Sequence, residues 1–305
     1  MLASKMDECQ DMIVSASYRT DIPAFYGQWF ENRFRAGFCR VVNPYGGPPA
    51  RVAMREGVDG YVFWTRHAGP FLPALAEVRR AGLPFIVQYT LTGYPRALEE
   101  GVIDEATSLA LIRRLSDEYG SRAVVWRYDP ILLTELTPPE WHVQNFSRLA
   151  SRLAGAVDEV VASFVQPYRK TDRNLAAAAR ARHFSWWTPP AWEKRQAIAR
   201  LAGIAQAHGM ALRLCTQPEL ESDAVAGARC IDAQRLADLS GRPIEAKTKG
   251  NRPGCLCSES RDIGAYDSCP QGCVYCYAVG SRNRAKDRLR GHDPDGEFLI
   301  GPAPC

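Results

Sequence analysis

The sequence contains no apolar run that approaches 18 residues, so it offers no membrane-spanning helix. Its first residues, MLASKMDECQDMIV, carry acids and a glutamine where a secretory signal needs an unbroken apolar segment. Charge of one sign is also scarce, because the net charge is only +4 and basic residues are interleaved with acids. We therefore expect a cytoplasmic protein with no membrane and no nucleic acid partner. One basic run, 282–290, fits either a solvated helix face or a phosphate contact.

Short β-branched runs alternate with amphipathic segments over most of the chain, a pattern typical of βαβ units. The expected strands span 12–17, 60–65, 84–91, 123–128, 158–165 and 210–216. The expected helices span 23–37, 70–81, 104–119, 138–155, 191–208 and 231–240. Because each strand is nearly continuous in apolar residues, the units fit a parallel sheet covered by helices.

We predict an α/β fold in which residues 1–245 form a (β/α)6-type partial TIM barrel, with a doubly wound sheet as the alternative. Residues 246–305 differ from the rest, since they are rich in Gly, Pro, Ser and Cys and poor in apolar residues. We expect this C-terminal segment to bind a metal cluster and to pack on the barrel mouth.

Ten cysteines are present, and seven of them lie between residues 215 and 276. In a chain of 305 residues without a secretory signal, clustered cysteines indicate metal or redox chemistry rather than disulfides. The stretch DSCPQGCVYCYA places Cys269, Cys273 and Cys276 in one tight loop. Three thiolates at this spacing suit three corners of a [4Fe–4S] cubane and leave the fourth iron open. A structural zinc ion is the alternative, although zinc sites usually contain CxxC pairs.

The CxxxCxxC loop, with Tyr275 before its third cysteine, resembles that of the radical S-adenosylmethionine superfamily. The stretches SASYRTDIPAFY at 15–26, WRYDPILL at 126–133 and IGAYDSC at 263–269 also resemble an uncharacterised prokaryotic family whose cysteine loop follows the barrel. The resemblance implies that S-adenosylmethionine binds the open iron and is cleaved reductively to a 5′-deoxyadenosyl radical, with Tyr275 near the cofactor. The sequence departs from the usual pattern of the superfamily in two ways. No cysteine loop follows the first expected strand, and the second expected strand lacks the Gly-Gly-Glu that often binds the methionine amine.

Four further cysteines, Cys215, Cys230, Cys255 and Cys257, form a full ligand set for a second, auxiliary [4Fe–4S] cluster. The alternative is that Cys215 and Cys230 are ordinary buried residues. Because Cys215 ends the sixth strand, the auxiliary cluster is expected at the barrel mouth, where it could donate sulfur to a substrate.

Polar residues follow the expected strands, where barrel enzymes place their chemistry. Arg19, Asp21, Arg127 and Asp129 are the candidates for binding the cofactor, since a guanidinium can fork onto a carboxylate while an acid holds an amine or ribose hydroxyls. The alternative for each is a buried ion pair between adjacent strands.

These features predict an enzyme that uses S-adenosylmethionine to functionalise a small polar substrate such as a nucleoside or amino-acid derivative, with sulfur insertion as one outcome. It would need an electron donor such as flavodoxin or ferredoxin. The alternatives are an iron–sulfur electron-transfer or sensing protein, and a radical enzyme that modifies nucleic acid.

Overall fold

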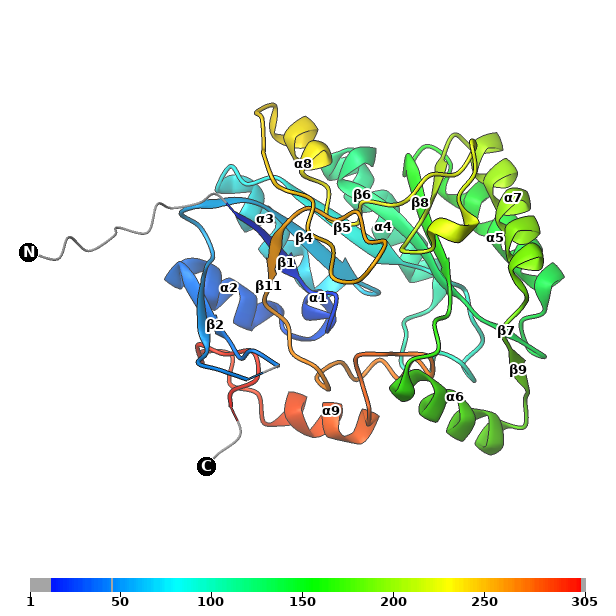
Figure 1. Cartoon of the computed structure of the whole chain (residues 1–305). Coiled ribbons are helices and arrows are strands. Elements are labelled where there is room, and N and C mark those ends of the chain that lie inside the picture. Colours follow the sequence, from blue (N-terminus) through cyan, green and yellow to red (C-terminus); the bar gives the residue numbers. More distant parts are fainter. Residues whose placement is uncertain (1–11, 45, 303–305) are drawn as a thin grey trace, which may run out of the picture.

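The computed structural model describes residues 12–44 and 46–302. A seven-stranded parallel sheet forms its centre, in the strand order β10-β8-β6-β5-β4-β1-β11 (Figure 1). The strands are β1 (Met12–Ala16), β4 (Val58–Thr65), β5 (Phe85–Thr90), β6 (Val124–Ile131), β8 (Glu159–Phe164), β10 (Ala211–Leu214) and β11 (Ser260–Asp262). The predicted α/β class and all six predicted strand positions are confirmed.

The sheet is open, with β10 and β11 at its edges, so the described residues form no closed barrel. Apart from β11, the strands follow one another across the sheet in chain order, as in a barrel and unlike the reversing order of a doubly wound sheet. The seventh strand, β11, comes from the cysteine-rich segment and pairs with β1 from Ser260 to Asp262. No strand was expected there, because three polar residues carry no periodic signal of their own.

Helices cover one face of the sheet. The strand side chains on that face, such as Phe63, Trp126 and Val160, pack into one apolar core with Phe30 and Phe146. The helices of this layer are α1 (Ile22–Phe25), α2 (Gly27–Ala36), α3 (Leu72–Arg80), α4 (Glu105–Tyr119), α5 (Pro139–Leu153) and α7 (Ala191–Ala207). The predicted helix 23–37 is therefore two helices, and Asp21 caps the first of them.

The opposite face of the sheet carries a smaller core. Alternate strand residues, including Ile13, Val62 and Val125, pack there against Leu236 of α8 (Ala233–Ser240). Figure 1 shows α8 beside the sheet, with α6 (Arg169–Arg182) and α9 (Arg282–Arg290) at the far end of the molecule. Toward the carboxyl ends of the strands, the residues of this face become polar, so it is the face on which the candidate site is built.

The remaining strands form two small sheets outside the centre. One pairs β2 (Phe38–Val41) with β3 (Ala50–Ala53), and the other pairs β7 (Leu133–Thr134) with β9 (Trp186–Trp187). No helix within the described ranges is long and apolar enough to cross a membrane.

A buried histidine makes the stability of this fold dependent on pH. Burial lowers the pKa of His142 to about 4, and its ring contacts the Tyr128 hydroxyl at 3.0 Å and the Leu132 carbonyl at 3.1 Å. Because the unfolded chain binds a proton more readily, stability is lost as the pH falls from about 6.5 through about 4. We expect a loss of about 3 kcal/mol from this residue.

Denaturant unfolding at several pH values measures this effect. His142→Gln should have a shallower pH dependence than the wild type, whereas His183→Asn, at an exposed position with a left-handed backbone, should keep the wild-type slope. An unchanged slope in His142→Gln would rule out His142 as the cause.

Candidate functional site

The three-cysteine loop, residues 263–281, runs between β11 and α9 and lies across the carboxyl ends of the central strands. Its backbone is hydrogen-bonded to the end of β1 and to the segment after β5: Ile263 N–H donates to the Ser15 carbonyl at 3.0 Å, and Val274 N–H to the Leu98 carbonyl at 3.0 Å. In open α/β sheets this edge is where ligands bind. The fold therefore places Cys269, Cys273 and Cys276 where chemistry is expected.

Two helices hold the loop from outside. Asn174 of α6 donates to the Val279 carbonyl at 2.9 Å, and Thr171 of α6 to the Tyr275 carbonyl at 3.3 Å. From α9, Arg282 donates to the Pro270 carbonyl at 2.9 Å and Arg288 to the Tyr266 carbonyl at 2.6 Å. Two members of the basic run are thus used to hold the loop.

The thiols of the loop are partly buried and electrostatically coupled. Burial raises the pKa of Cys273 to about 12, with the Arg66 guanidinium acting in the opposite direction. Burial also raises the pKa of Cys276, opposed by the backbone N–H groups of Ala278 and Val279 and by Arg66 and Lys170. The pKa of Cys269 is raised by burial and by the Asp21 carboxylate. These surroundings disfavour three simultaneous thiolates unless a positive ligand binds them.

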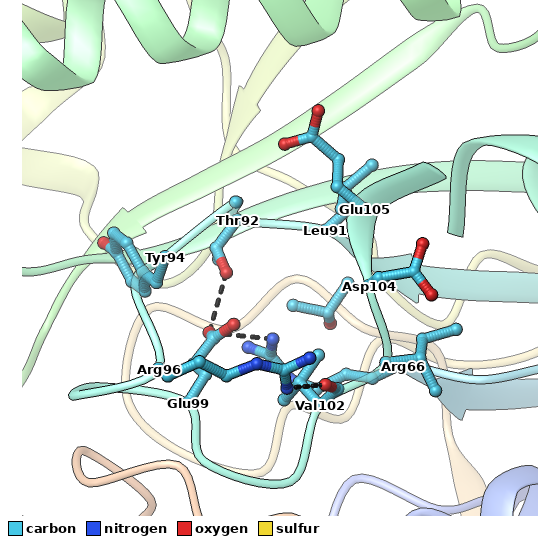
Figure 2. Close-up of a pocket in the computed structure, with 12 residues that line it drawn as sticks. Arg66, Leu91, Thr92, Tyr94, Arg96, Glu99, Val102, Asp104 and Glu105 are labelled. Carbon is cyan, nitrogen blue, oxygen red and sulfur yellow. Dashed lines mark hydrogen bonds and ion pairs between the residues drawn. The ribbon is translucent and has the colours of Figure 1, made fainter. Parts of the chain in front are cut away.

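A buried ion pair lies behind the loop. Arg66, at the end of β4, is 2.8 Å from Glu99 and donates to the Tyr275 hydroxyl at 2.5 Å. The Tyr275 hydroxyl donates in turn to Glu99, which also accepts from Thr92 at 2.7 Å. Figure 2 shows Arg66, Glu99 and Thr92 converging at one wall of a pocket. Its volume is about 250 Å³, and it is lined by Arg66 and by residues between Thr90 and Glu105. Tyr275 is therefore fixed by this pair and directed away from solvent.

Asp21, a candidate for binding the cofactor, is surrounded by protein donors. Its carboxylate accepts from the backbone of Ala24 at 3.1 Å and Arg66 at 2.9 Å, and from the Gln271 side chain at 3.1 Å. Burial raises the pKa of Asp21. Asp21 thus links the start of α1, the end of β4 and the cysteine loop.

Arg19 pairs with Asp262 of β11 rather than with Asp21. Its Nε lies 2.8 Å from the carboxylate, which also accepts from the hydroxyls of Ser15 at 2.8 Å and Ser17 at 2.7 Å. Both charged side chains are buried. This is the ion pair between adjacent strands that the sequence analysis kept as the alternative for Arg19.

The second group of cysteines comes together between β10, α8 and the segment before β11. The sulfurs of Cys215 and Cys230 are 3.8 Å apart, Cys230 hydrogen-bonds Cys257, and Cys257 hydrogen-bonds Cys255. The hydrogen bond to Cys257 lowers the pKa of Cys255 to about 6, whereas that between Cys230 and Cys215 raises the pKa of Cys215. Four residues spread over 43 positions of the chain therefore form one continuous chain of thiols.

Two guanidinium groups contact this four-cysteine group. Arg127 Nη1 lies 3.0 Å from the Cys230 sulfur, and Arg252 Nη2 lies 3.7 Å from the Cys215 sulfur. Arg127 also forms a bidentate ion pair with Asp129, in which Nε lies 3.0 Å from one carboxylate oxygen. The candidates Arg127 and Asp129 are thus a bound pair, and they lie beside the second cysteine group rather than beside the loop.

A short series of side chains connects the two cysteine groups. Tyr277 follows Cys276, its ring centroid lies 5.9 Å from that of Tyr168, and the Tyr168 hydroxyl accepts from Arg252 at 2.6 Å. Arg252 then contacts Cys215. Tyr168 and Tyr277 are 38% and 41% exposed.

One family model matches residues 13–278, which is most of the chain, and its description is a domain of unknown function, DUF1848. The chain belongs to the DUF1848 family. Neither the curated proteins nor the solved structures contain a match to this DUF1848 chain.

The expected membership of the radical S-adenosylmethionine superfamily is wrong. The matching family is DUF1848, and no radical S-adenosylmethionine family matched. Within residues 12–44 and 46–302, no three or more His, Cys, Asp or Glu side chains are grouped so that they could hold a metal ion. The resemblance to the superfamily depended on the cysteine spacing of one short loop and on Tyr275 within it, and such a motif is a local property that does not define a family.

Several residues of the site were missed by the sequence analysis. Arg66, Glu99, Asp262 and Arg252 were not among the predicted site residues. Glu99 and Arg252 lie in irregular segments, where no periodicity predicts which way a side chain points. A lone acid such as Asp262, in a polar strand of three residues, gives no signal of its burial.

Proposed function

We propose that this DUF1848 protein is an iron–sulfur enzyme that cleaves S-adenosylmethionine reductively and functionalises a small polar substrate. The observation that carries the proposal is the position of Cys269, Cys273 and Cys276 on one loop across the carboxyl ends of the parallel strands. The proposal rests on this placement of thiols and not on membership of any superfamily. In the proposed enzyme, the open sheet acts as a partial (β/α)6 barrel. The three-cysteine loop covers the mouth of that barrel.

The loop residues suit a [4Fe–4S] cluster with one open iron. Each thiolate of a cubane binds a different iron, so three thiols on one loop can hold three corners, a different geometry from the close grouping around a single zinc ion. Metal binding requires thiolates, and Arg66, Lys170 and the N–H groups of Ala278 and Val279 favour the ionised form of Cys276. When bound, such a cluster supplies an electron and an open iron that the amine and carboxylate of S-adenosylmethionine can chelate.

The chain's own residues would position the reactants and exclude water. The loop is joined to the strand ends through Gln271 and Asp21, and the Tyr275 hydroxyl is held by Arg66 and Glu99. On the sheet, Gln88, Arg127 and Asp129 form a largely buried polar group joined by hydrogen bonds of 3.0 and 3.1 Å. Hydrogen-bonding groups of this kind suit a small polar substrate such as a nucleoside or amino-acid derivative.

The four-cysteine group supports a second, auxiliary [4Fe–4S] cluster. Its thiols come from three separate segments, and Arg127 and Arg252 would offset the negative charge of bound thiolates. Because Cys230 lies 3.0 Å from Arg127, a cluster held by these four cysteines would lie beside this polar group, and the chemistry it would supply is a sulfide for the substrate. Sulfur insertion is therefore the favoured outcome within this proposal.

Product analysis tests the proposed activity. Anaerobically reconstituted protein, given dithionite or a flavodoxin or ferredoxin donor, should convert S-adenosylmethionine to 5′-deoxyadenosine and methionine. Cys273→Ala should abolish the conversion, whereas Cys39→Ala, at a buried cysteine outside both groups, should retain it. Equal traces of product from the wild type and Cys273→Ala would contradict the proposed function.

The second candidate is an iron–sulfur electron-transfer or sensing protein. The observation favouring it is the path from Cys276 through Tyr277, Tyr168 and Arg252 to Cys215, which would bring two clusters into communication. Such a protein would bind iron at both groups and release no 5′-deoxyadenosine. A nucleic-acid substrate gains less support, because Arg282 and Arg288 of the basic run are engaged with the loop.

A further inference from the structure

Arg66 is one of the most deeply enclosed cations near the cysteine loop. Its side chain is only 10% exposed, it follows the last residue of β4, and its backbone N–H is fixed by Asp21. Burial alone would lower the pKa of Arg66, but the nearby Glu99 and Tyr275 raise it well above its ordinary value. An arginine guanidinium stays protonated in proteins, and these two partners favour its charged form.

The guanidinium has two partners that are themselves tied to the loop. Tyr275, which accepts from Arg66, lies between Cys273 and Cys276 in sequence, and Glu99 forms a β-bridge with Cys273. The Arg66–Glu99 pair is thus attached to the loop through both side chain and backbone. These contacts connect the guanidinium to the segment of the chain that carries the thiols.

Both charges of the pair lie against the loop. The Arg66 guanidinium donates to the Tyr275 hydroxyl at 2.5 Å, and Glu99, 2.8 Å from Arg66, is bridged to Cys273. Because both side chains are buried, solvent screens their charges less than it would at the surface. Each charge therefore acts on the electrostatic potential at the loop.

We propose that Arg66 is a positioning residue that raises the reduction potential of a cluster held by Cys269, Cys273 and Cys276. The carboxylate of Glu99 has the opposite effect on this potential. This inference rests on the proposed function, because it assumes a cluster in the loop. Reduction adds one electron to the cluster, so a fixed cation nearby favours the reduced state and a fixed anion opposes it. The electron comes from a one-electron donor of the flavodoxin or ferredoxin type, which is oxidised in the same step.

The test is a redox titration of the loop cluster, followed by electron paramagnetic resonance, in full-length protein that retains both clusters. Arg66→Gln removes the charge, and we expect at least a tenfold fall in the equilibrium constant for reduction, which is about 59 mV toward negative potential for one electron. Glu99→Gln removes the opposing charge and should shift the potential the other way. Arg66→Lys keeps the charge and should stay nearer the wild type than Arg66→Gln.

Arg235→Gln is the matched control, because Arg235 is an equally buried arginine paired with Asp158 and Glu159 near the start of β8, away from the loop. Its potential should equal that of the wild type. Full iron content with an unchanged potential in Arg66→Gln would overturn the inference. If Arg66→Gln loses its iron, its potential cannot be measured, and Glu99→Gln becomes the test. An unchanged reduction potential in Glu99→Gln would also overturn the inference. A wild type that binds no iron would instead contradict the proposed function.

Discussion

Replacing Cys269, Cys273 and Cys276 together by alanine is expected to halve the iron content, from about eight to about four atoms per chain, and to abolish 5′-deoxyadenosine formation. The reason is the separation of the two cysteine groups. The loop that carries three of the thiols is hydrogen-bonded to Ser15 of β1 and to Leu98 after β5, whereas the other four thiols form their own series of contacts from Cys215 to Cys255. Loss of one set should therefore leave the second set able to bind its own cluster.

Iron and acid-labile sulfide analysis after anaerobic reconstitution measures this result. Cys39→Ala is the control for loss of a buried thiol, since Cys39 lies in β2 and belongs to neither group, and it should keep all the iron. The circular dichroism of the triple variant should match that of the wild type, because β11 and α9 are anchored independently of the three sulfurs. An iron content unchanged by the triple substitution would contradict the assignment of the loop.

Cys230→Ala is expected to remove the other four irons and to stop sulfur transfer while leaving 5′-deoxyadenosine formation in place. Cys230 is the central member of its group, since it contacts Cys215, Cys257 and the Arg127 guanidinium. Its loss should break the chain of thiols in the middle. The loop contacts none of these thiols directly and should keep its cluster.

Clusters reconstituted with isotopically labelled sulfide allow sulfur transfer to be followed. The wild type should pass label into the product, and Cys230→Ala should not. A conservative comparison is Ser163→Ala, which removes a hydroxyl 3.5 Å from Asp129 without touching a thiol and should leave the iron content unchanged. Many turnovers to a product that gains no sulfur, with both clusters intact, would defeat sulfur insertion and leave a relay role for the second group.

The sheet was predictable because its signal is local. Continuous apolar runs such as those of β5 and β8 read as buried parallel strands, and the alternating helices followed from their amphipathic pattern. The two-residue strands β7 and β9 and the three-residue β11 were not predictable, because segments so short have no measurable period. Helix α6 was missed because its first turn, Arg169 to Asp172, is charged and reads as a loop.

The cysteines were singled out because their type and spacing are distinctive, and in the structure Cys215, Cys230, Cys257 and Cys255 form one series of thiol contacts. The roles of the charged residues were harder to predict, because they depend on which side chains meet across the sheet. Arg19 and Asp21 stand two positions apart, yet Arg19 pairs with Asp262 and Asp21 receives donors from three segments. Arg66 and Glu99 are 33 positions apart, and only the fold joins them to Tyr275.

The central claim, that the loop thiols hold a cluster with one open iron, is tested most directly by Mössbauer spectroscopy of protein reconstituted with isotopically enriched iron. The account predicts a [4Fe–4S] spectrum from about eight irons per chain, in which S-adenosylmethionine shifts the signal of a single iron. Stoichiometric zinc with no iron–sulfur spectrum, or a spectrum that S-adenosylmethionine leaves unchanged, would contradict it.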